Sequence, residues 1–251
     1  MKGAGYMLDG YPLRKYDWKD WVLMGLSSSL FLQVAAVIAL SYFIGLFMNT
    51  YSPDTLVSIS INGTVFGTLL SLPLTLLVVY LRKIPIFNRK QLSKEESFII
   101  RGLTKEDWSF LVKYIPFSYV LYMVGSSVVA YLFGASEAAN QIAVESLFDT
   151  IPVWVMFLMI VVVAPIVEEL LFRGMFLFKG DRLDTTWTRL LISAILFGLI
   201  HGPSDVYTAY TYIGMGLMFS YASKRTQSVE SAIIYHFLNN LVGFLVIVAL
   251  G

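Results

Sequence analysis

The chain has 251 residues, of which 57% are hydrophobic and 14% charged, and its mean hydropathy is +0.71. Because an average soluble domain carries about 25% charged residues, this composition excludes a soluble globular enzyme. Low charge and abundant aromatic residues exclude a disordered chain. A net charge of +1 provides no field that would attract nucleic acid. The chain has no cysteine for disulfides, thiolate nucleophiles or zinc, and each of its two histidines needs an explanation.

Charge-free apolar runs predict an all-α fold, a polytopic transmembrane helical bundle of about seven spans, within a range of about six to eight. A spanning helix needs roughly 20 predominantly apolar residues. The fourth run is long enough only if it continues through two acids and an arginine to about residue 178, and the fifth is short. The candidate runs are 21–48, 55–81, 114–136, 150–167, 190–204, 206–223 and 231–251.

The basic residues predict how the chain is oriented. Every Lys and Arg except Arg173 falls in the N-terminal segment or in the loops 82–113, 179–189 and 224–225, whereas the alternate connections have none. Short loops rich in Lys and Arg stay in the cytoplasm. We therefore expect a cytoplasmic N-terminus and an outside C-terminus. The short loops, together with the absence of an evident cleavable signal, favour an integral protein of a bacterial plasma membrane.

Two connections carry helix signals of their own. In the loop 82–113, Ser93 and Thr104 are each followed three residues later by an acid, which predicts two short helices with capping boxes. The second should run into the third span, with Pro116 at a kink or a restart. Residues 137–149 place their apolar side chains roughly on one face, which predicts an amphipathic helix on the outer surface.

The glycines and tyrosines in the spans are interpreted as packing residues. Two GxxxG patterns, at 63–67 and 198–202, predict close helix packing. Gly202 and the proline after it should end the fifth helix just beyond His201. The tyrosines at 207, 210 and 212 are expected to form an outer interfacial belt and packing surface rather than a substrate site.

Ionisable side chains inside apolar spans are rare, because a charge at the bilayer centre costs about 2.5–3.5 kcal/mol. A lone intramembrane histidine most often makes a helix–helix hydrogen bond, and a Glu–Arg pair four residues apart is most often structural. Depth favours a functional site here: at 1.5 Å per residue, Glu168, His201 and His236 each lie roughly 16–18 Å from a basic residue at the cytoplasmic face. The complete set, with one amide, is Glu168, Glu169, Arg173, His201, His236 and Asn240.

Helical spacing predicts how these residues are oriented. Glu169 and Arg173 are four residues apart with the acid first, the favourable order for an ion pair on one helix face. Glu168 is rotated by about 100° from Glu169 and therefore points elsewhere. Phe197 precedes His201 by one turn and is expected to wall its ring.

A carboxylate, two imidazoles and an amide around a buried cavity are the parts of a hydrolytic site. Glu168 and His201 are placed to deprotonate a water molecule that attacks a peptide carbonyl. His236 and Asn240, one turn apart, are placed to donate hydrogen bonds to the oxyanion. The sequence therefore indicates peptide hydrolysis within the membrane.

The three motifs occur in order on successive apolar segments. VEELLFRG at 167–174 contains EExxxR, FGLIH at 197–201 contains FxxxH, and HFLNN at 236–240 contains HxxxN. Together they resemble the CAAX protease and bacteriocin-processing (CPBP, or Abi) family of intramembrane endopeptidases.

The resemblance implies roles at the matching positions. Glu168 would be the general base, working with His201, and His236 and Asn240 would stabilise the oxyanion. Glu169, Arg173 and Phe197 would be supporting residues; this sequence, which does not depart from the motifs, gives no sign of an inactive member.

The resemblance also implies a division of the chain within one integrated membrane domain. Residues 1–150 would hold the N-terminal transmembrane helices with the cytoplasmic loop 82–113, and residues 151–251 would form the CPBP-like catalytic helical core. The expected partners are the lipid bilayer and a membrane-associated protein or peptide substrate, with no nucleic acid. The site is expected to open toward the cytoplasmic side. The sequence indicates neither the substrate nor the oligomeric state.

The role of metal is a separate question, because the family was first described as metalloproteases. Glu168, His201 and His236 would be the zinc ligands in that case. Neither histidine lies in an HExxH arrangement, and an asparagine beside His236 suits an oxyanion better than zinc. We therefore expect a glutamate-type mechanism with no cofactor, and zinc is the alternative.

Two other functions are compatible with buried polar residues. Buried Glu and His side chains also form proton relays, so a proton- or ion-coupled transporter is one alternative. Confinement of these residues to the C-terminal half weighs against it, because transporters often repeat broken helices in two halves. A non-catalytic membrane scaffold or immunity protein is the other.

Overall fold

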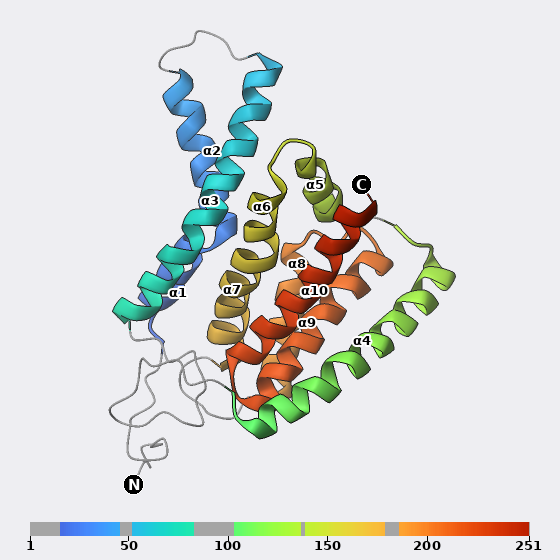
Figure 1. Ribbon diagram of the computed structural model, residues 1–251. Helices are drawn as coiled ribbons and strands as arrows, with labels where there is room; N and C mark the ends of the chain where they lie inside the picture. Colours follow the sequence, from blue (N-terminus) through green and yellow to red (C-terminus); the bar gives the residue numbers. More distant parts are fainter. Residues whose placement is uncertain (1–15, 46–51, 83–102, 137–138, 179–185, 251) are drawn as a thin grey trace.

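The computed structural model describes residues 16–45, 52–82, 103–136, 139–178 and 186–250, and every regular element in these ranges is helical, which confirms the all-α prediction. Figure 1 shows the arrangement. In chain order the helices are α1 (Trp18–Ser27), α2 (Ser29–Gly45), α3 (Pro53–Arg82), α4 (Lys105–Phe133), α5 (Ala139–Phe148), α6 (Val153–Met156), the π-helical η2 (Phe157–Val163), α7 (Ala164–Glu169), the π-helical η3 (Leu170–Phe178), α8 (Trp187–Ile200), α9 (Val206–Thr226) and α10 (Val229–Leu250).

The helices have the lengths and apolarity of a membrane bundle. Within the described ranges, four segments are long and apolar enough to span: α3, α4, the stretch Val153–Leu177 and most of α10. The pair α1–α2 qualifies when taken together, whereas α8 is apolar but shorter. Every predicted run falls on one of these elements or on α9, so the chain is an integral membrane protein, and the structure agrees with the prediction of about seven spans.

The first predicted span is broken. The run at 21–48 was expected to form one helix, but α1 and α2 meet at an angle of 59° at Ser28. Ser28 has extended backbone angles, and both its N–H and its hydroxyl donate to the carbonyl of Gly25, at 3.2 and 2.6 Å. A serine that bonds the neighbouring backbone competes with the helical hydrogen-bond pattern, which accounts for the break.

Helices α2 and α3 lie side by side as a hairpin (Figure 1). A Cβ atom at Gly63 would come within 2.6 Å of Val37, and one at Gly67 within 2.5 Å of the backbone of Gln33. Only glycine permits this approach, so the GxxxG pattern at 63–67 packs helices as predicted. The lower end of α3 is tied to α1 by Arg82, which forms ion pairs of 2.7 Å with Asp17 and Asp20.

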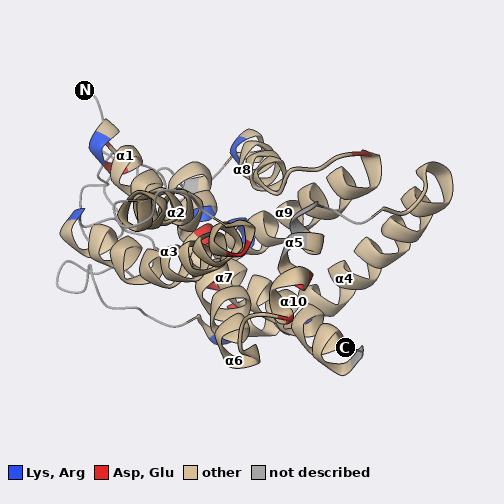
Figure 2. Ribbon diagram, turned by 90° about the horizontal axis from the view of Figure 1, so that it is seen from above, with Lys and Arg blue, Asp and Glu red and all other residues tan. Residues whose placement is uncertain are grey.

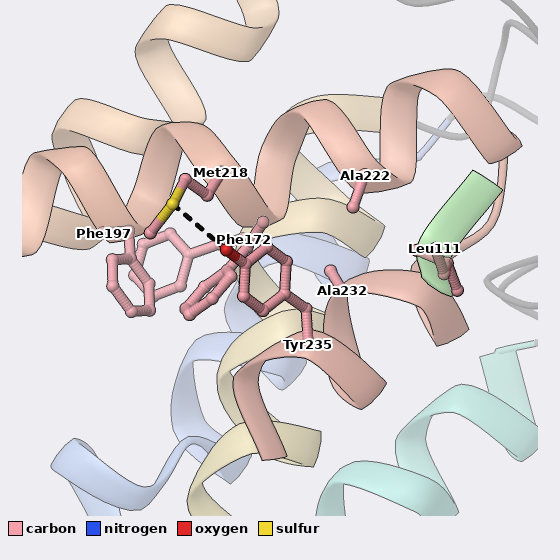
Figure 3. Close-up of a cluster of buried hydrophobic side chains, with 8 residues drawn as sticks. Leu111, Phe172, Phe197, Met218, Ala222, Ala232 and Tyr235 are labelled. Atoms are coloured by element: carbon pink, nitrogen blue, oxygen red, sulfur yellow. Dashed lines mark hydrogen bonds between the residues drawn. The ribbon is translucent and has the colours of Figure 1, made fainter. Parts of the chain in front are cut away.

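The EExxxR segment lies at the centre of the bundle. Helix α7 packs against α3 and α10, and η3, which follows it, packs against α8, α9 and α10. Figure 2 shows this part of the bundle from above. A close contact between α8 and α9 also requires glycine, because a Cβ at Gly198 would lie 2.4 Å from Ile213. Behind the site, η3, α8, α9 and α10 contribute to a buried aromatic cluster that includes Phe172, Phe197 and Tyr235 (Figure 3).

The predictions for the connections have mixed outcomes. Thr104 caps α4 in a capping box as predicted, accepting a hydrogen bond from the Asp107 N–H at 3.2 Å. Helix α4 runs without interruption from 105 to 133, so the second predicted helix continues into the third span as expected and does not restart at Pro116. Helix α5 lies within the predicted segment 137–149. The helix expected near Ser93 lies outside the described residues.

Candidate active site

The predicted site residues meet at one cavity of about 810 Å³ in the middle of the bundle. Its walls come from α2, α3, α5, the stretch 153–177, α8, α9 and α10. Glu169 and Arg173 are fully buried and do not line this cavity. The predicted residues that line it are Glu168, Phe197, His201, His236 and Asn240.

The lining residues show in which direction the cavity runs. They extend over 57–68 on α3, over 156–168 on the central span and over 236–247 on α10. Glu168 therefore lies at the deep end, and the lining extends from it toward α5 and the last turns of α10, which lie together in Figure 1. The opening of the site toward the cytoplasmic side stays a prediction, because the structure fixes no side of the membrane. This end of the cavity lies away from the helix ends that lead into the basic loops. The sequence offered no means to foresee this, since the direction depends on how α5 and the α2–α3 hairpin pack.

Glu169 and Arg173 form the predicted pair, at 2.9 Å from Nη1 to Oε1. Arg173 also donates to the carbonyl of Gly216 at 2.8 Å and to the hydroxyl of Ser220 at 3.2 Å. The same Oε1 of Glu169 accepts from Nδ1 of His236 at 2.9 Å. A buried charge needs an opposite charge and hydrogen bonds, and this network supplies both. Since a carboxylate only accepts, the His236 proton lies on Nδ1 and fixes the orientation of the ring.

Glu168 and His201 meet at the deep end of the cavity. Oε2 of Glu168 lies 3.9 Å from Nε2 of His201 and is buried without a hydrogen-bond partner in the described residues. Nδ1 of His201 lies 2.8 Å from the carbonyl of Phe197. Because a carbonyl only accepts, Nδ1 carries a proton, and Nε2 is an acceptor when the ring is neutral. Two hydrogen-bond acceptors therefore face each other across 3.9 Å.

The end of α8 positions the His201 ring. The helix ends at Ile200, and Gly202 takes a left-handed φ of +62° that favours glycine, as the Gly-Pro pair predicted. The ring lies between Phe197, with centroids 4.7 Å apart, and Tyr212, stacked at 4.5 Å. Phe197 thus walls the ring as expected.

Tyr212 is a site residue that the sequence analysis missed. It was assigned to an outer belt, but it is buried and lines the cavity. The other two tyrosines do pack between helices, since Tyr210 stacks on Tyr122 and Tyr207 accepts from Ser126. No motif marks Tyr212; its position follows from the register of α9 against α8.

Asn240 is anchored to the π-helical η2 for a reason that lies in the sequence. The Ala164 N–H donates five residues back, to the carbonyl of Met159. The next residue, Pro165, has no N–H to continue this pattern onto Ile160. The amide of Asn240 donates instead to the Ile160 carbonyl at 2.9 Å. One of its two N–H groups is therefore used for structure.

The alternative zinc set consists of Glu168, His201 and His236. Among the described residues, no group of three His, Asp or Glu side chains is placed to hold a metal ion. Glu168 and His201 approach each other, and Nδ1 of His236 is bonded to Glu169, which leaves Nε2 of that ring available to a metal or to an oxyanion.

These observations define a polytopic membrane protein with a cluster of ionisable and amide side chains in its centre. Residues 150–242 match the family model described as Type II CAAX prenyl endopeptidase Rce1-like. Together with the three motifs, this match confirms the resemblance of residues 150–242 to the CPBP family.

Three curated relatives are similar to the chain. The membrane-embedded CAAX protease MroQ of Staphylococcus aureus (strain USA300) is 27% identical over 154 residues, covering 57% of this chain and 60% of that protein. The putative membrane peptidase YdiL of Bacillus subtilis (strain 168) is 28% identical over 118 residues, 47% of each chain. The UPF0177 protein YbdI of Lactococcus lactis subsp. lactis (strain IL1403) is 28% identical over 138 residues, 49% of this chain and 74% of that protein.

The chain thus spans only about half to three fifths of the length of the first two relatives. No solved structure matches the chain.

Proposed function

We propose that this protein is an intramembrane endopeptidase that hydrolyses peptide bonds of membrane-associated proteins or peptides. The observation that carries the proposal is the pair of acceptors, Glu168 Oε2 and His201 Nε2, 3.9 Å apart at the deep end of the cavity. Relatives of the chain are bacterial proteins described as a CAAX protease and a putative peptidase. We place the protein in a bacterial plasma membrane, with its N-terminus in the cytoplasm and its C-terminus outside.

The two acceptors suit a single water molecule, which has two hydrogens to donate. One O–H donates to Glu168 and the other to His201, so the oxygen lone pair is directed at the substrate carbonyl. As the C–O bond forms, Glu168 takes a proton from the water; when the C–N bond then breaks, Glu168 delivers this proton to the leaving amine. His201 keeps the water oriented throughout, because its Nδ1–H is held by the Phe197 carbonyl.

The oxyanion is assigned to His236 and the free N–H of Asn240. Glu169 accepts from Nδ1 of His236 and would stabilise that ring as an imidazolium, whose Nε2–H then donates to the oxyanion. Arg173 balances the charge of Glu169 and keeps Glu169 from competing with Glu168 for the proton of the attacking water. Glu169 and Arg173 are thus positioning residues, and the step requires no metal.

A proteomic comparison of cells tests this function. Membrane and secreted peptides are compared between cells with the wild-type protein, Glu168→Ala and Glu106→Ala, a matched change of an exposed acid in the first turn of α4. Glu168→Ala should remove a specific set of cleaved peptides and accumulate their precursors, and Glu106→Ala should not. Identical peptide sets in all three strains would contradict the proposal. Uptake of an uncleaved peptide into proteoliposomes would instead indicate a transporter.

A further inference from the structure

The cavity has a polar wall that lies outside the segment matched by the family model. Besides the residues at 150–242, it is lined by Gln33 on α2 and by Ser60, Thr64 and Thr68 on α3. The last three are four residues apart and follow one face of the helix. Polar side chains in membrane-spanning helices face the protein interior or a cavity and mark functional pathways.

Gln33 is held in place by close packing of the two helices. Gly67 lets the backbone of α3 approach the backbone of Gln33. The Gln33 amide then donates to Thr68 Oγ1 at 2.7 Å, and Thr68 donates its only hydroxyl hydrogen to the carbonyl of Thr64 at 2.8 Å. Because Thr68 can only accept from Gln33, the amide orientation is fixed. Its oxygen Oε1 points away from Thr68 and accepts no hydrogen bond within the described residues.

A peptide substrate in this cavity needs hydrogen-bond partners for its backbone, and the polar wall carries such groups. Inside a membrane, every backbone N–H and C=O must find a partner in the protein. Ser60 and Thr68 are separated along α3 by about 12 Å, the length of about four residues of extended chain. The hydroxyls of Ser60 and Thr64 and the Gln33 amide therefore match a short extended segment that ends near Glu168.

We propose that Gln33, with Thr64 and Ser60, binds the backbone of the substrate segment next to the scissile bond, and that Gln33 Oε1 accepts one substrate N–H. The inference rests on the proposed endopeptidase function. It adds a substrate-binding role for the N-terminal helices, which carry none of the family motifs.

Kinetics with a defined peptide test the inference. The full-length protein in proteoliposomes is screened with a pool of synthetic dodecapeptides that have an apolar centre, and the fastest-cleaved peptide is used thereafter. Gln33→Met should raise KM by about 3- to 10-fold, the change expected for one lost hydrogen bond, and should leave kcat within about twofold. Thr64→Val should act in the same direction. The control Asn62→Leu removes an exposed amide of α3 that does not line this cavity and should leave both constants unchanged.

Ester analogues of the peptide test the hydrogen bond between a substrate N–H and Gln33 Oε1. Replacing each backbone N–H near the scissile bond by an ester oxygen should lower kcat/KM of the wild type about 3- to 10-fold at one position. In the Gln33→Met variant, the ester replacement at that position should cause no further loss of kcat/KM. A wild-type KM for both Gln33→Met and Thr64→Val, or equal ester effects in wild type and Gln33→Met, would overturn the inference.

The proposed function has a separate control. If Glu168→Gln cleaves the peptide like the wild type, or if the wild type cleaves nothing in the pool, the endopeptidase function fails and the inference fails with it. If Glu168→Gln is inactive while Gln33→Met has wild-type kinetics, only the inference fails.

Discussion

Replacing Arg173 by methionine should be among the most destabilising single changes in this protein. Methionine fills a similar volume but removes the guanidinium, which is fully buried together with Glu169. The variant loses the 2.9 Å ion pair and the hydrogen bonds to Gly216 and Ser220. Glu169 is then a buried carboxylate whose remaining partner in this network is His236.

The magnitude follows from this isolation. Removing one partner of a buried ion pair costs about 3–5 kcal/mol, because the other charge is left uncompensated. Removing both charges in Glu169→Leu/Arg173→Met should recover most of this loss. The double variant still lacks the bond from His236 to a charged group, worth about 1.5–3 kcal/mol.

Reversible unfolding in detergent micelles, followed by circular dichroism, gives the free energies for this cycle. Arg225→Met is the matched control: Arg225 is exposed at the end of α9 and lies 5.5 Å from the Phe110 ring. It should cost about 0.5–1 kcal/mol. The reasoning is refuted if Arg173→Met costs no more than Arg225→Met. It is also refuted if the double variant is less stable than Arg173→Met by about 3–5 kcal/mol, as two independent losses would make it.

Three further predictions concern the site, its scaffold and metal dependence. Tyr212→Leu removes the ring stacked on His201 and should lower kcat about 2- to 10-fold with little change in KM, whereas Tyr212→Phe keeps the ring and most of the activity; equal loss in both variants would contradict a stacking role. Gly67→Ala should cost about 1–3 kcal/mol of unfolding free energy because its Cβ meets the α2 backbone, while Gly25→Ala, with open space around its Cβ, should be neutral or slightly stabilising. Peptide cleavage should persist in EDTA and 1,10-phenanthroline; stoichiometric zinc in the purified protein, whose removal stops cleavage, would show that the glutamate-type mechanism is wrong.

The sequence predicted the parts of the fold that depend on short-range spacing. Glu169 and Arg173 pair because residues four apart share a helix face, and Thr104 caps α4 through a local box. Glu168, His201 and His236 converge on one cavity, because polar groups in an apolar chain are stable only in a common interior. The roles of these residues, the division at residue 150 and the orientation stay predictions.

The features that were missed depend on a single local hydrogen bond at Ser28 or on contacts between distant segments. The bend at Ser28 follows from one hydroxyl that bonds a carbonyl within an otherwise continuous apolar run. Tyr212 faces His201 because of how α8 and α9 pack, and Asn240 bonds Ile160 because of the hydrogen-bond pattern of a π-helix before Pro165. None of these contacts has a periodic signature in the sequence.

The most direct test of the central claim is the initial rate of peptide cleavage by the purified protein in proteoliposomes. Wild type, Glu168→Gln and Glu106→Gln are compared at equal amounts of folded protein. If Glu168 activates the attacking water, Glu168→Gln should lower kcat by a factor of about 10²–10⁴, and Glu106→Gln should cleave like the wild type. A Glu168→Gln rate within twofold of the wild type would contradict the account.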